Sequence, residues 1–87
     1  MRINNAVDLG KYVRERRRAE GMTQQRLAEH AGVSRRWLSG LEAGKPSAEI
    51  GLVLRVVAAL GLFADIRPAP KPEIDLDEYL KTFEGPR

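Results

Sequence analysis

The feature that most constrains this chain is a glycine turn between two short segments with helical apolar spacing. The segments cover approximately Gln24–Ala31 and Arg35–Ala43. Thr23 and Ser34 stand directly before them, and hydroxyl side chains are favourable N-caps of helices. Gly32 lies between the segments and can adopt the left-handed backbone conformation that a sharp turn requires. The sequence therefore predicts two short helices that meet through a turn of only a few residues.

Two helices joined in this way form the sequence outline of a helix-turn-helix, in which the second helix enters the major groove of DNA. In the second predicted helix, Leu38 and Leu41 fall on one side. Arg35, Arg36 and Ser39 fall on the opposite side. Arginine can donate two hydrogen bonds to a guanine base edge in that groove. We therefore predict that Arg35, Arg36 and Ser39 contact DNA bases.

Residues beside the second helix are predicted to contact DNA phosphates. Gln24 begins the first helix of the pair, which crosses the DNA backbone in this motif. Ser34, Trp37 and Lys45 carry further hydrogen-bond donors nearby, with Trp37 on the border between the outer and core faces. In an alternative interpretation the two arginines are only solvated side chains, but the adjacent turn argues against it.

The first predicted helix, over residues 6–20, has Asn5 as its N-cap and contains an unusual arginine. Arg17 falls on the apolar stripe of Leu9 and Val13, and an unpaired buried guanidinium is costly. Arg17 therefore needs a carboxylate partner. The other arginines of the run 14–18 are expected to form a solvated face.

The last predicted helix, over residues 47–60, is apolar nearly all round and should be buried on two sides. Residues 62–67 then alternate as a strand does, but no second strand is evident in the chain. The simplest partner is the same strand in a second copy, and the alternative is a coil on the core. The residues predicted at this dimer contact are Leu52, Val56, Leu62, Ala64 and Ile66.

Charge divides the chain into a basic body and an acidic end. Residues 1–70 hold 12 basic and 7 acidic side chains, whereas residues 71–87 hold 3 basic and 5 acidic ones. A basic body points to a polyanion as partner. We divide the chain into a helix-turn-helix domain (1–61), a dimerisation strand (62–67), a proline-rich linker (68–72) and an acidic amphipathic tail (73–87).

The tail has apolar residues at helical spacing and could dock on another protein, fold back or stay disordered. Its candidate contacts with such a protein are Leu76, Tyr79, Leu80 and Phe83.

Composition excludes several classes of function. The chain has no cysteine and one histidine, so we expect no disulfide, no metal site and no cofactor. His30 with Ser34, Ser39 or Ser47 could be imagined as a catalytic set, but no nucleophile motif surrounds these serines. We therefore expect no enzyme. Without a signal peptide or an apolar run of membrane-spanning length, we expect a cytoplasmic, nucleoid-associated protein.

The stretch 9–61 resembles the XRE, or lambda-repressor-like, helix-turn-helix family. The matching residues are Leu9-Gly10, Val13-Arg14, Arg17, Gly21-Met22-Thr23-Gln24, Leu27-Ala28, Gly32-Val33-Ser34, Leu38-Ser39, Leu41-Glu42 and Gly44. The resemblance implies a compact all-helical domain, a dimer on a palindromic operator in double-stranded DNA, and a buried ion pair of Arg17 with Glu42. It also implies base contacts at Arg35, Arg36 and Gly40, and a phosphate contact at Gln24. Gly40 departs from the family because glycine has no side chain to read a base.

The four-helix core, the segment 60–67 and the short tail resemble the HipB branch of antitoxins in particular. That resemblance implies a mainly all-α, four-helix domain with one C-terminal β-strand that pairs across a dimer. It further implies a repressor of its own operon that neutralises a HipA-like kinase toxin, which these four apolar residues of the tail would contact. The alternatives are a plain XRE-family regulator without a toxin and a protein-interaction adaptor that does not bind DNA.

Overall fold

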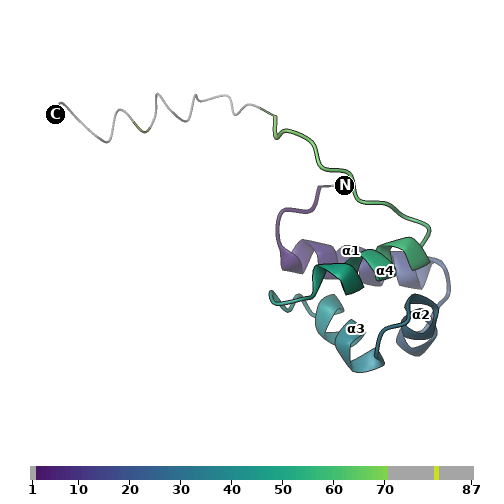
Figure 1. Cartoon of the computed structure of the whole chain (residues 1–87). Coiled ribbons are helices and arrows are strands. Elements are labelled where there is room, and N and C mark those ends of the chain that lie inside the picture. The colour runs from purple at the N-terminus through teal and green to yellow at the C-terminus, as the bar shows by residue number, and fades with distance from the viewer. Residues whose placement is uncertain (1, 71–79, 81–87) are drawn as a thin grey trace.

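The computed structural model describes residues 2–70 and 80, and residues 2–70 contain four helices (Figure 1). They are α1 (Ala6–Ala19), α2 (Gln24–Ala31), α3 (Arg35–Glu42) and α4 (Ile50–Ala59). Helix α2 packs against both α3 and α4, and α1 packs against α3. The predicted all-α, four-helix domain is confirmed.

The first three helices begin at the N-caps predicted from the sequence. Asn5 accepts a hydrogen bond from the backbone N–H of Asp8 at 2.8 Å. Thr23 accepts one from the third residue after it at 3.1 Å, and Ser34 does the same at 3.0 Å. Gly32 ends α2 with φ 71° and ψ 37°, the left-handed conformation that a side chain would strain. Local chemistry thus determines where the helix-turn-helix begins and turns.

Helix α4 begins three residues later than the predicted start at Ser47. Glu49 has an extended backbone (φ −63°, ψ 122°), and its side chain makes no capping hydrogen bond. Its carbonyl accepts the N–H groups of Leu52 and Val53, each at 3.1 Å. The hydroxyl of Ser47 suggested a cap, but the backbone becomes helical only after Glu49.

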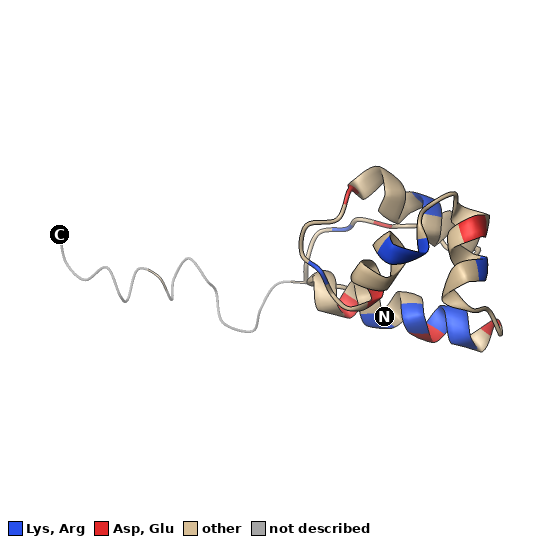
Figure 2. Cartoon of the chain, turned by 90° about the horizontal axis from the view of Figure 1, so that it is seen from below, with Lys and Arg blue, Asp and Glu red and all other residues tan. Residues whose placement is uncertain are grey.

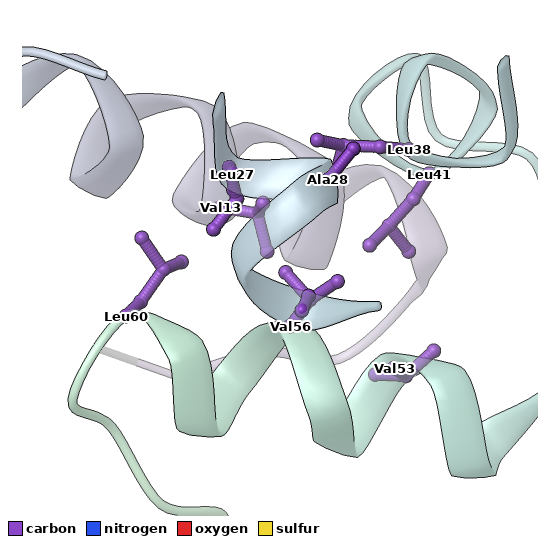
Figure 3. Packing of buried hydrophobic residues seen from close by; sticks show 9 residues of the cluster. Val13, Leu27, Ala28, Leu38, Leu41, Val53, Val56 and Leu60 are labelled. Carbon is purple, nitrogen blue, oxygen red and sulfur yellow. The ribbon is translucent and has the colours of Figure 1, made fainter. Parts of the chain in front are cut away.

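The core draws apolar side chains from all four helices (Figure 3). The buried residues are Val13, Leu27, Ala28, Ala31, Leu38, Leu41, Val53, Val56 and Leu60. The structure contradicts the prediction that Val56 contacts a second copy, because its side chain is 0% exposed and points into this core. Helix α4 is rotated so that it leaves Ile50 (71% exposed) and Leu54 (48% exposed) on its outer side instead.

Residues 62–70 follow α4 without helix or strand in this single chain. Leu62 packs partly against the core, whereas Ala64 is exposed and Ile66 is 96% exposed. A strand over 62–67 would need a second copy to complete its hydrogen bonds. Its pairing across a dimer therefore stays a prediction.

Most of the acidic tail, including Leu76, Tyr79 and Phe83, lies outside the described residues. Leu80 is described and is 48% exposed. None of the helices in the described part of the chain is long and apolar enough to cross a membrane.

Candidate nucleic-acid interface

A buried ion pair joins α1 to the C-terminal end of α3. Arg17 Nε donates to Glu42 Oε2 at 2.8 Å, and Nη2 donates to Oε1 at 2.9 Å. Arg17 Nη1 also donates to the backbone carbonyl of Met22 at 2.8 Å. The Glu42 side chain is only 3% exposed, and its hydrogen bonds raise the pKa of Arg17 above the ordinary value. Glu42 is therefore the carboxylate partner that Arg17 was expected to need, and its bidentate geometry favours the burial of such a pair.

Close backbone contact keeps α1 and α3 in this position. Gly10 of α1 faces the carbonyl groups of Leu41 and Glu42. A Cβ atom at position 10 would lie 2.8 Å from the Glu42 oxygen and even closer to that of Leu41. Glycine thus allows the close approach of α1 to α3, and the ion pair secures the same contact a few residues further along α1.

Helix α3 presents its predicted base-reading residues to solvent. Arg35, Arg36 and Ser39 are all exposed, while Leu38 and Leu41 on the opposite side are buried. Figure 2 shows the molecule from below the view of Figure 1, the side on which α2 and α3 lie, and basic residues occur there on several helices. The structure therefore anchors α3 by its leucines and leaves both arginines available to a partner.

Gly40 of α3 is partly covered by a neighbouring side chain. It is half-buried, and a Cβ atom there would meet the aliphatic part of Lys45 at 3.6 Å. The Lys45 stem therefore covers part of the helix where a base-reading side chain would otherwise stand.

The predicted phosphate contacts fall on both sides of α3. Ser34, Trp37 and Lys45 line one hollow of about 480 Å³, together with Arg36. Lys45 and Ser34 are exposed, whereas Trp37 is half-buried against the core. The Ser34 hydroxyl oxygen already accepts the cap hydrogen bond of α3, so its own proton remains to be donated.

Gln24 lies on the other side of α3 and is tied to the buried ion pair. Its Nε2 donates to Glu42 Oε1 at 3.2 Å. An amide nitrogen has two protons, so one remains for a phosphate. The network thereby orients the start of α2 as well as the end of α3.

Two cationic residues at this side were missed by the sequence interpretation, which treated them as part of a solvated face. Arg14 and Arg18 line a second hollow of about 410 Å³ together with Gln24 and Ser39. Their i, i+4 spacing on α1 was the available signal, because it places both on one helix face. What the sequence could not show is that α2 and α3 bring their own polar residues to that face.

A family model described as a helix-turn-helix domain matches residues 8–69. The chain belongs to the XRE-like helix-turn-helix family. It is 46% identical over 65 residues to the uncharacterized HTH-type transcriptional regulator y4mF of Sinorhizobium fredii, covering 75% of this chain and 86% of that protein. It is 43% identical over 49 residues to an uncharacterized HTH-type transcriptional regulator of Methanothermobacter thermautotrophicus, covering 56% and 71%. This family membership makes the chain a transcriptional regulator with a DNA-binding fold.

Two solved structures place this helix-turn-helix fold among known proteins. The restriction-modification controller protein C.AhdI from Aeromonas hydrophila is 32% identical, with a TM-score of 0.61, covering 66% of this chain and 83% of that one. HipB in a HipA-HipB-O2-O3 complex is 18% identical with a TM-score of 0.75, covering 80% of this chain and 99% of that one. The HipB likeness is one of fold alone.

Proposed function

We propose that this helix-turn-helix protein is a homodimeric, sequence-specific repressor that also acts as the antitoxin of a HipA-like kinase toxin. The observation that carries the DNA-binding part is the outward arginine pair at the start of α3. Arg35 and Arg36 are exposed, and Leu38 and Leu41 on the opposite side of the helix are buried in the core. The first residues of such a helix reach base edges in the major groove.

A second copy is supported by the apolar side chains that the single chain leaves in water. Ile50 and Leu54 lie on the outer side of α4, and Phe63 and Ile66 follow in the next segment with 85% and 96% exposure. Large exposed apolar side chains gathered in adjacent segments are typical of protein interfaces. A two-fold dimer would present two α3 helices about 34 Å apart, one turn of DNA, to a palindromic operator.

The antitoxin part rests on the fold and the acidic tail. HipB has this fold in a complex that also contains HipA. The region 73–87 follows a proline-rich linker and carries an excess of acidic residues. A short acidic amphipathic segment of this kind can bind a groove on another protein.

The second candidate is a regulator without a toxin partner, and sequence identity favours it. The chain is 32% identical to the controller C.AhdI but only 18% identical to HipB. An adaptor that does not bind DNA would give no role to the exposed pair Arg35 and Arg36.

DNA binding is tested by selecting duplexes from a random library and measuring gel shifts at two salt concentrations. We expect an enriched palindrome, and binding that weakens steeply as salt rises. Arg35→Ala and Arg36→Ala should reduce the preference for that palindrome, and Glu29→Ala on the exposed side of α2 is the control. If no duplex is enriched and none shifts at low salt, the adaptor is the better interpretation.

The toxin role is tested separately with the product of the neighbouring gene. We expect a kinase-type protein that copurifies with the full chain and is lost when residues 73–87 are removed, while DNA binding stays intact. A neighbour without a kinase fold, or a kinase that never copurifies, would favour the plain regulator.

A further inference from the structure

The four arginines of α1 fall into two pairs with different surroundings. Arg16 contacts Glu20 at 3.3 Å, and Arg17 is bound by Glu42 at 2.8 Å. Within the described part of the chain, no carboxylate oxygen lies within 4.0 Å of Arg14 or Arg18. Two guanidinium groups on one face of α1 are thus left without a protein anion.

We propose that Arg14 and Arg18 form a phosphate-binding site of the DNA interface, on the α1 side of the recognition helix. The proposal rests on the proposed DNA-binding function and adds a third helix to the contact surface. Arg14 and Arg18 line the hollow of about 410 Å³ together with Gln24 and Ser39. The lining therefore combines two cations of α1 with polar groups of α2 and α3.

The carboxylate in this hollow does not cancel its charge. Glu42 accepts hydrogen bonds from Arg17 at 2.8 and 2.9 Å and from Gln24 at 3.2 Å. Its single negative charge is matched by the positive charge of Arg17, so the excess that remains belongs to Arg14 and Arg18. The hollow is therefore set up for an anion.

Phosphate is an anion that these groups are well suited to bind. Guanidinium groups bind phosphate oxygens through paired N–H donors. Helix α2 begins at Gln24, and the N-terminus of a helix adds favourable N–H groups and dipole for an anion. Gln24, the first residue of α2, lines this hollow.

The position of the hollow points to a DNA backbone rather than to a small phosphate compound. The hollow of about 480 Å³, lined by Arg36, Trp37 and Lys45, contains the other predicted phosphate contacts. Ser39 lines the hollow of Arg14 and Arg18, and Gly40, the next residue of α3, lines the hollow of Arg36 and Lys45. A helix in the major groove has one sugar-phosphate strand on each side, so two flanking cationic hollows match that geometry.

The test measures the salt dependence of binding to a random-sequence duplex, because phosphate contacts need no operator. Each neutralised phosphate contributes about 0.9 to the slope of log K against log salt. We expect Arg14→Gln and Arg18→Gln each to make that slope less steep, by about 0.9 per bound subunit. Arg14→Lys and Arg18→Lys should keep most of it, since the charge remains.

Arg16→Gln is the matched control, because it removes the same charge from the same helix at a residue already paired with Glu20. Its slope should equal that of the wild type. Thermal melting of each variant checks that the fold is retained, and both Gln variants should melt as the wild type does because Arg14 and Arg18 are exposed. Base preference on the selected palindrome should not change in Arg14→Gln or Arg18→Gln.

Slopes of Arg14→Gln and Arg18→Gln that equal the Arg16→Gln slope would overturn this site and leave the proposed DNA-binding function standing. A changed base preference with an unchanged slope would also overturn it, since the two arginines would then read bases. Failure of the wild-type protein to bind any duplex would overturn both proposals.

Discussion

Two regions of the molecule differ in the side chains that they bury and expose: the α1–α3 region (residues 6–42) and the α4 region (residues 50–67). In the first, a charged pair is buried, Arg17 with Glu42, and basic residues such as Arg35 face solvent. In the second, large apolar residues face solvent, with Ile50 at 71% and Ile66 at 96% exposure. Buried charge is tolerated because each hydrogen-bonding group is matched, whereas an exposed apolar face remains unfavourable until something covers it. One chain therefore satisfies the buried charges of the α1–α3 region, whereas large apolar side chains of the α4 region stay exposed in it.

The largest effect is expected where the buried pair is broken. Arg17→Ala should destabilise the fold by about 3–5 kcal/mol, because it leaves the Glu42 carboxylate buried without its partner. Chemical denaturation measures the loss. The control is Arg16→Ala, which removes the partly exposed ion pair with Glu20 and should cost about 0–1 kcal/mol. Equal losses in the two variants would show that the α1–α3 region does not depend on the buried pair.

The next effect concerns the exposed apolar residues of the α4 region. Ile66→Asp should abolish dimerisation without lowering the stability of the monomer, since a buried isoleucine contributes about 1.5–3 kcal/mol and a buried charge is unfavourable. Sedimentation reports the oligomeric state. Val56→Asp is the contrasting variant, because it places a charge in the core and should unfold the chain itself. A dimer that survives Ile66→Asp would move the contact away from residues 62–67.

A smaller effect is expected for the exposed arginines of α3, on the affinity for DNA rather than on the stability of the fold. Arg35→Ala and Arg36→Ala should each weaken binding to the selected palindrome by about 1–3 kcal/mol and relax the preference at one base pair. Their denaturation curves should match the wild type, because both side chains are exposed. Unchanged preference in both variants would place base recognition elsewhere.

The smallest effect is expected at Gln24, which belongs both to the ion-pair network and to the candidate interface. Gln24→Ala should weaken binding to all duplexes alike by about 0.5–1.5 kcal/mol, as the loss of one hydrogen bond predicts. Competition between the palindrome and a random duplex measures whether preference is kept. A variant that loses preference for the palindrome would mean that Gln24 acts by positioning α3.

Sequence reasoning succeeded where the signal is local and failed where it depends on how helices rotate against each other. The caps Asn5, Thr23 and Ser34 act within three residues, so their hydrogen bonds were predictable. The face of α4 was not, because a helix apolar nearly all round gives no periodic signal to distinguish Val56 from Leu54. The hollow that Arg14 and Arg18 line was not predictable for a related reason, because the residues of α2 and α3 that line it with them come beside α1 only after folding.

The amino-acid sequence by itself determined the order of the helices, the turn at Gly32, the need of Arg17 for an acidic partner and the outward arginine pair. Each of these follows from chemistry within one or two helical turns or from the cost of burying an unpaired charge. Only the tertiary structure decided which side of α4 enters the core and which arginines of α1 border the candidate interface. Those outcomes depend on packing between helices distant in the chain, where several rotations bury similar apolar area and shape complementarity selects one.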